Sequence, residues 1–76
     1  MTWNHRVVRK RYEMTTPLLG IHEVFYDNEG VPDAVTVDPV GVQGETLGEL
    51  GEVLGWMTKA LGQPILEYDD IPPGGE

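Results

Sequence analysis

The chain has 76 residues, no cysteine and no serine, and its 13 acidic and 5 basic residues give a formal net charge of −8. This length predicts a single domain with a small core. The missing residue types exclude a disulfide framework, a thiolate zinc site and a cysteine or serine nucleophile. The sequence has no long apolar run, and its first residues lack the apolar core of a signal peptide. We therefore expect a cytoplasmic protein.

The charge is distributed unevenly along the chain. Residues 1–11 contain four basic residues and no acidic one, a formal charge of +4, whereas residues 12–76 contain all 13 acidic residues and only Lys59, a formal charge of −12. Direct binding to nucleic acid or to an anionic membrane requires lysine and arginine. The acidic remainder therefore favours a basic protein surface as partner. The alternative is that the acidity serves only solubility.

Two strands are predicted first. Residues 3–13 are rich in strand formers and contain no glycine or proline. Their buried face is left open, because Val7 and Val8 point to opposite sides. Residues 18–26 form a second, largely apolar strand. The basic side chains of the first strand either neutralise their neighbours in the sheet or form a separate basic face.

A hairpin and a third strand follow. Asp27–Gly30 has the composition of a tight turn, in which Gly30 takes a positive φ. Residues 33–38 alternate with a period of two, which places Val35 and Val37 on one face.

A helix is predicted from about residue 46 to 61. Thr46 and Glu49 have capping-box spacing, in which Thr46 caps the Glu49 amide and Glu49 reaches back to the Thr46 amide. Gly62 stands where a C′ glycine ends a helix. The apolar residues recur with helical spacing, namely Leu47, Leu50, Leu54, Met57 and Leu61, with Val53 and Ala60 beside them.

Three glycines interrupt this helix. Gly48, Gly51 and Gly55 each cost about 0.8–1 kcal/mol relative to alanine. Gly48 and Gly55 lie away from the apolar stripe. Either another backbone approaches them closely, from a second copy or a partner, or they are a stability cost that the helix caps offset in part.

Residues 65–68 predict a short fourth strand, and residues 71–76 a flexible C-terminal tail. The predicted order is β-β-β-α-β within a single domain over residues 1–70. This order favours an α+β fold, in which one helix packs on one face of an antiparallel sheet.

No motif for catalysis or metal binding stands out. His5 and His22 are the only imidazoles, and a metal site would require them to meet across paired strands. Asp69 and Asp70 form the tightest carboxylate pair, but a domain of this size rarely encloses a substrate pocket. We therefore expect a protein that is not an enzyme and that has no metal and no cofactor.

The most informative pattern is an acidic helix side that contains a tryptophan. Glu45, Glu49, Glu52 and Trp56 lie together on the side away from the apolar stripe. Trp56 is either a hot spot for a basic surface or a side chain that folds over onto the sheet. Further acidic residues extend this candidate binding surface from the hairpin and from the C-terminal end: Asp27, Glu29, Asp33, Glu67, Asp69 and Asp70.

Residues 37–61 resemble the HicB-type antitoxin domain. The matching pieces are Gly44-Glu45-Thr46, Glu49 and Ala60-Leu61. The resemblance implies the β-β-β-α-β order and a function in neutralising a basic toxin. The chain differs from the family in having Asp38-Pro39 where Pro-Asp is usual, and in lacking a C-terminal DNA-binding segment.

By size and charge alone, the chain also resembles small phage-encoded inhibitors such as anti-CRISPR proteins, several of which are similar to nucleic-acid mimics. The leading hypothesis is therefore a non-catalytic acidic inhibitor in a bacterial host. It would bind a basic nucleic-acid-binding surface and block target DNA binding by a CRISPR effector. The alternative is a HicB-like antitoxin or orphan domain that binds a basic toxin. The partner, the stoichiometry and the oligomeric state are left open.

Overall fold

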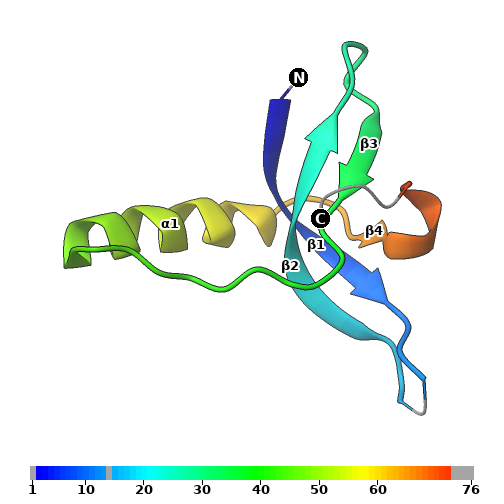
Figure 1. Cartoon of the computed structure of the whole chain (residues 1–76), viewed down its shortest axis with the longest axis horizontal. Coiled ribbons are helices and arrows are strands. Elements are labelled where there is room, and N and C mark those ends of the chain that lie inside the picture. The colour runs from blue at the N-terminus through cyan, green and yellow to red at the C-terminus, as the bar shows by residue number, and fades with distance from the viewer. Residues whose placement is uncertain (1, 14, 73–76) are drawn as a thin grey trace.

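The computed structural model describes residues 2–13 and 15–72, and shows the predicted α+β class. Four strands and one α-helix follow one another in the order β-β-β-α-β, and a short 3₁₀ helix, η1, ends the described chain (Figure 1). The elements are β1 (Thr2–Lys10), β2 (Leu18–Tyr26), β3 (Pro32–Val35), α1 (Leu47–Ala60), β4 (Leu66–Glu67) and η1 (Tyr68–Asp70).

The four strands form one sheet in the order β3-β2-β1-β4. β1 pairs antiparallel with β2, and β2 with β3. β4 instead pairs parallel with β1, with Val8 opposite Leu66. The prediction of a purely antiparallel sheet was therefore wrong for this edge. The connection from β3 to β4 passes through α1 and explains the difference. It is long enough for the chain to enter β4 in the same direction as β1, which permits parallel pairing.

One sheet face carries the main core. Val8, Val24 and Val35 are fully buried and form a cluster with Ile71, against which Tyr68 packs. Ile71 belongs to the segment predicted as a flexible tail, but its side chain is buried in this cluster. Pro72 is exposed, and the remainder of the predicted tail, residues 73–76, lies outside the described residues.

The opposite face is covered by the end of α1. His5 and Val7 are buried on this face of β1, which α1 contacts, and the buried residues of the helix are Met57 and Ala60. Val7 and Val8 are thus both buried, because each face of β1 has its own cover. The helix packs on the sheet only through this end, whereas Leu47 at the other end is 86% exposed.

α1 and the segment before it project from the sheet as an arm, defined here as residues 36–61. Figure 1 shows residues 36–46 running outward in extended form and α1 running back toward the sheet. The helix therefore begins far from the sheet and reaches it only in its last turns.

Within residues 2–13 and 15–72, no helix has the length and the hydrophobicity that are needed to span a bilayer.

The hairpin between β2 and β3 forms as predicted. Gly30 has φ 81°, a conformation that favours glycine. β3 is shorter than predicted and ends at Val35. Beyond it, the Thr36 amide donates to the Glu23 carbonyl (3.1 Å) and the Val40 amide to the Ile21 carbonyl (2.9 Å), so the chain stays along β2 outside a regular strand.

The ends of α1 agree closely with the prediction, except for the role of Gly62. This residue does not take a positive φ. The helix instead ends in a tighter turn, where the Leu61 amide donates to the Thr58 carbonyl (3.0 Å) and the Gly62 amide to the Lys59 carbonyl (3.1 Å).

Candidate functional site

Arg6 is the first basic side chain of β1, and it is used inside the fold. It is half-buried, donating from Nη1 to the Tyr26 hydroxyl (3.1 Å) and from Nη2 to the Pro64 carbonyl (2.7 Å). The Tyr26 hydroxyl donates in turn to Asn4 Oδ1 (2.7 Å). This network ties the loop before β4 to the middle of the sheet.

Arg9 and Lys10 are also used internally. Arg9 forms an ion pair with Glu67 across the parallel β1–β4 edge. Lys10 donates to the Val37 carbonyl, and its ammonium lies 4.3 Å from the centre of the Tyr68 ring. The basic segment therefore binds its own neighbours within the fold, although only Arg9 neutralises an acid, and only Arg11 of its four cations is exposed without such a contact in the described residues.

The start of α1 brings the predicted helix carboxylates together. The Glu49 amide donates to Thr46 Oγ1 (3.1 Å), as predicted. The Glu49 carboxylate accepts from the Glu45 amide (2.9 Å) rather than from the Thr46 amide. Gly44 permits this tight approach, because a Cβ there would lie 2.9 Å from the Leu50 amide nitrogen. Glu45, Glu49 and Glu52 are all exposed, but Glu49 also holds the helix start together.

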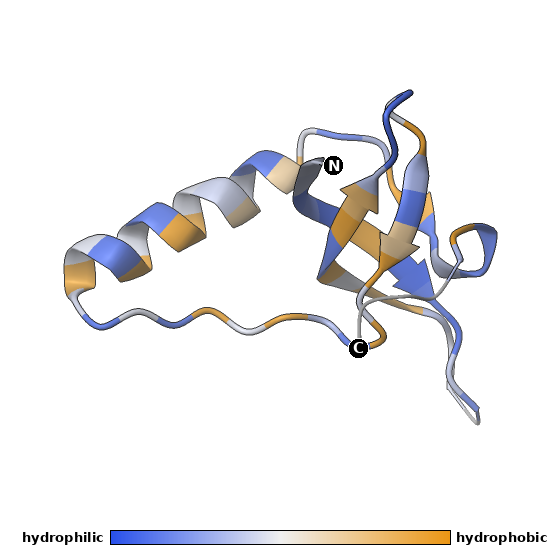
Figure 2. Ribbon diagram, turned by 45° about the horizontal axis from the view of Figure 1, so that its top comes forward, coloured by the Kyte–Doolittle hydropathy of each residue, from blue (hydrophilic) through white to orange (hydrophobic). Residues whose placement is uncertain are grey.

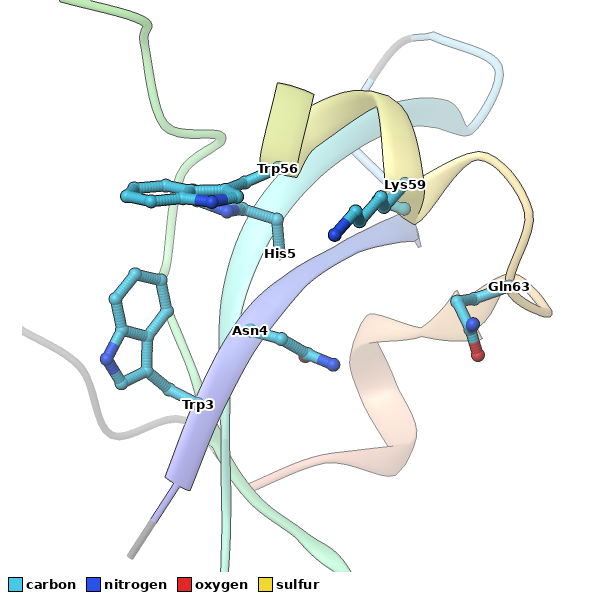
Figure 3. Close-up of a pocket in the computed structure, with 7 residues that line it drawn as sticks. Trp3, Asn4, His5, Trp56, Lys59 and Gln63 are labelled. Carbon is cyan, nitrogen blue, oxygen red and sulfur yellow. The ribbon is translucent and has the colours of Figure 1, made fainter. Parts of the chain in front are cut away.

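Trp56 lies one turn after Glu52 and is 50% exposed. It lines a groove of about 430 Å³ between the end of α1 and β1. Figure 3 shows its indole on the same side of β1 as Trp3 and His5. The other residues of the groove are Asn4, Lys59, Ala60 and Gln63. Trp56 is therefore neither a core side chain nor a fully exposed one.

Trp3 is the part of this groove that the sequence analysis missed. Its ring is 49% exposed and lies edge-on to His5, with the ring centres 5.3 Å apart. The spacing of Trp3 and His5, two residues apart on a strand, places both on one face and was the available signal. That this face lies beside Trp56 depends on where α1 ends.

The hairpin acids differ in whether they bind within the fold. Asp27 Oδ1 accepts from the Glu29 amide (2.8 Å) and the Val31 amide (3.0 Å), so this carboxylate stabilises the turn. Glu29 and Asp33 are exposed.

The C-terminal acids are divided in the same way. Glu67 pairs with Arg9, while Asp69 and Asp70 in η1 are exposed. Figure 1 shows that the start of α1, the hairpin and η1 lie at three different extremities of the molecule. The predicted acidic residues therefore form three separate groups rather than one continuous face.

The two histidines do not meet. His5 pairs with Glu23 and Arg6 with His22, so the imidazoles point to opposite faces of the sheet. His22 is fully buried, and its Nδ1 lies 2.9 Å from the Thr36 carbonyl oxygen. Because a carbonyl oxygen only accepts, Nδ1 carries the proton. Within residues 2–13 and 15–72, no three potential metal-ligating side chains gather at one place.

Compared with known proteins, the chain matches no family model, no curated protein and no solved structure.

Proposed function

We propose that this protein is a non-catalytic acidic inhibitor that occupies a basic nucleic-acid-binding surface of another protein. In its most specific form, the proposal is an anti-CRISPR-like DNA mimic that blocks target DNA binding by a CRISPR effector. The observation that carries the proposal is the unequal use of charge. The cations of β1 bind acceptors within the fold, whereas most carboxylates are exposed.

The consequence is an outer surface that is strongly negative. Arg9–Glu67 is the single ion pair among the described residues, so the remaining carboxylates are not neutralised by a neighbouring side chain there. A surface of this kind attracts a basic partner over a long range and accelerates its association at low salt. Spaced carboxylates on a rigid helix can also take the places of phosphates.

We place the contact on the side of α1 that carries Glu52 and Trp56, together with Glu45 directly before the N-cap. The half-exposed indole offers a large apolar contact of the kind found at binding hot spots, and its face attracts a guanidinium. Glu52 lies one turn away and supplies a carboxylate to the same group. Lys59 lines the groove beyond Trp56 and repels a cation there, so the partner's arginine approaches from the Glu52 side.

Charge reversal tests this placement. Glu49 is a poor choice, because its carboxylate also binds the Glu45 amide. Glu52 is exposed and has no such bond, so Glu52→Lys reverses the charge without disturbing the helix start. Glu29→Lys on the hairpin is the matched control. Binding to a panel of purified CRISPR effector complexes is measured by calorimetry, with target DNA as competitor.

The expected result is that Glu52→Lys weakens binding at least about tenfold, because like charges across an interface are strongly unfavourable. Glu29→Lys leaves binding unchanged, and target DNA displaces the protein. The reverse order of the two variants contradicts the placement on the helix. Binding that DNA never displaces contradicts mimicry.

Trp56→Ala separates the two roles of the indole. As a hot spot, Trp56 contributes more than about 1 kcal/mol to binding, and its loss leaves the melting temperature unchanged. A lower melting temperature with unchanged affinity assigns Trp56 to the fold instead.

The alternative function is a HicB-like antitoxin or orphan domain. It is favoured by the element order, which agrees with what that resemblance implies, and by the helix start formed by Gly44, Thr46 and Glu49. Growth rescue on co-expression with a small basic toxin, together with a stable complex of the two, supports this alternative. Displacement from a CRISPR effector by DNA supports the mimic.

A further inference from the structure

α1 carries an uncovered apolar seam along its whole length. We define the leucine seam as the residues that recur at alternating spacings of four and three: Leu47, Gly51, Leu54, Thr58 and Leu61. This spacing keeps them in one line along a helix. Leu47 is 86%, Leu54 47% and Leu61 70% exposed, so residues 2–13 and 15–72 leave the line uncovered. Figure 2 shows apolar residues recurring along α1 as far as the end remote from the sheet.

The seam differs from the part of the helix that packs on the sheet. Met57 and Ala60 are buried there, while the seam lies beside them on the same helix. Leucines that stay in solvent gain no free energy from burial in an isolated chain. Exposed apolar surface of this regularity is typical of an interaction site.

The small residues of the seam, Gly51 and Thr58, alternate with its leucines along the helix. A Cβ added at Gly51 would meet nothing within 4 Å, so no contact in the described chain requires glycine there. The Thr58 hydroxyl donates to the Leu54 carbonyl (2.7 Å), which satisfies the hydroxyl within the helix and leaves the methyl group for packing. Small residues between leucines provide the recesses into which the leucines of a facing helix insert.

We infer that the leucine seam is the interface of an antiparallel homodimer, with the two-fold axis at Leu54. Leu47 and Leu61 are each seven residues from Leu54, so the axis pairs Leu47 of one copy with Leu61 of the other. The surface is then complementary to itself, as a two-fold interface requires.

For two copies of this acidic chain, charge favours the antiparallel over the parallel orientation. The seam contains no charged residue, and Glu49 and Glu52 lie on the opposite side of the helix. Because each sheet is attached at the C-terminal end of its helix, an antiparallel pair holds the two acidic bodies at opposite ends (Figure 1). A parallel pair would bring the two acidic sheets together.

The contact is modest in size. A seam of this length is about 21 Å long. Two helices in contact over that length bury less than about 1,200 Å² in total, which is typical of weak and reversible association. The dimer leaves both Glu52–Trp56 surfaces exposed, so the inference is independent of the proposed function.

Sedimentation equilibrium of the full chain, in buffer with salt high enough to screen the acidic bodies, tests the dimer. We expect a reversible monomer–dimer equilibrium in the micromolar to millimolar range. Leu54→Glu weakens it at least about tenfold, because two carboxylates then meet at the axis. Glu52→Gln, on the other side of the helix, leaves it unchanged. Circular dichroism checks that each variant keeps the helix.

A mixture gives the sharper result. Leu54→Lys alone also fails to associate, but an equal mixture of Leu54→Glu and Leu54→Lys recovers dimers, because opposite charges meet at the axis. A wild-type chain that stays monomeric at millimolar concentration overturns the inference, as does a Leu54→Glu variant that associates as well as the wild type.

Cross-linking tests the orientation, and the absence of native cysteine makes single-cysteine variants unambiguous. Leu54→Cys forms a disulfide-linked dimer by itself. Leu47→Cys forms none by itself but links to Leu61→Cys in a mixture, since only that pair comes within disulfide reach. Efficient self-linking of Leu47→Cys overturns the antiparallel arrangement.

Discussion

The sheet and the arm bury their apolar residues to very different extents. The sheet has a cover on both faces: Val8, Val24 and Val35 are fully buried on one face, and His5 and Val7 are buried on the other. The arm carries an equally regular apolar pattern, but the buried residues of its helix are the two that touch the sheet. A helical periodicity of apolar residues thus identifies a helix and its apolar side, but it does not identify the surface that covers that side.

The two regions also differ in how they use charge. In the sheet, Arg6, Arg9 and Lys10 each contact an acceptor from another part of the chain. In the arm, Glu45 and Glu52 are exposed, and the carboxylate of Glu49 binds only the Glu45 amide just before the helix. The same chain therefore uses charge to close its fold in one region and leaves it exposed to solvent in the other.

The largest effect should come from the C-terminal cover of the sheet. Ile71→Ala is expected to lower the free energy of unfolding by about 3 kcal/mol, because it opens a cavity in the main core. Ile65→Ala is the matched control, since Ile65 is exposed, and should change it by about 0.5 kcal/mol or less. Urea unfolding measures both. Equal losses would place Ile71 outside the core.

The internal cation of the sheet should have the next largest effect. Arg6→Met removes two hydrogen bonds from a charged donor and is expected to cost about 2 kcal/mol in the free energy of unfolding. Arg11→Met, at an exposed position, should cost about 0.5 kcal/mol or less. If both variants unfold alike, the basic segment does not connect the sheet.

A smaller effect is expected at the remote end of the arm. Thr46→Ala removes the N-cap bond to Glu49 and should cost about 1 kcal/mol. Because this end does not touch the sheet, the loss should appear as faster amide hydrogen exchange in the first turns of α1 and not in β2. Thr16→Ala, in an exposed loop, is the control. Uniformly faster exchange would show that arm and sheet unfold together.

The smallest effect should have the opposite sign. Gly51→Ala is expected to raise the free energy of unfolding of the monomer by about 0.8 kcal/mol, through helix propensity and without a clash. Gly30→Ala should lower it instead, because Gly30 has a positive φ. Both are measured by urea unfolding at micromolar concentration, where association contributes little. A loss at Gly51 would mean that the helix needs glycine even in the monomer.

Much of the local structure was predicted from the sequence. The limits of β2, the turn at Gly30 and the limits of α1 depend on neighbouring residues, whose strand propensity, backbone freedom and capping act over a few positions. The candidate site was predicted in part. Glu49, Glu52 and Trp56 lie on one side of α1, where the helical period places Glu52 one turn before Trp56, while Glu45 directly precedes the N-cap Thr46.

The tertiary structure alone decided which faces are covered and what the charges do. The parallel pairing of β4, the burial of Ile71, the groove of Trp3 beside Trp56 and the inward contacts of the β1 cations all join residues far apart in the chain. Composition determined a small acidic domain without cysteine or serine chemistry. The helix is held to the sheet only at its end, and this placement decided that Leu47, Leu54 and Leu61 stay exposed, because apolar side chains are buried only where another surface reaches them.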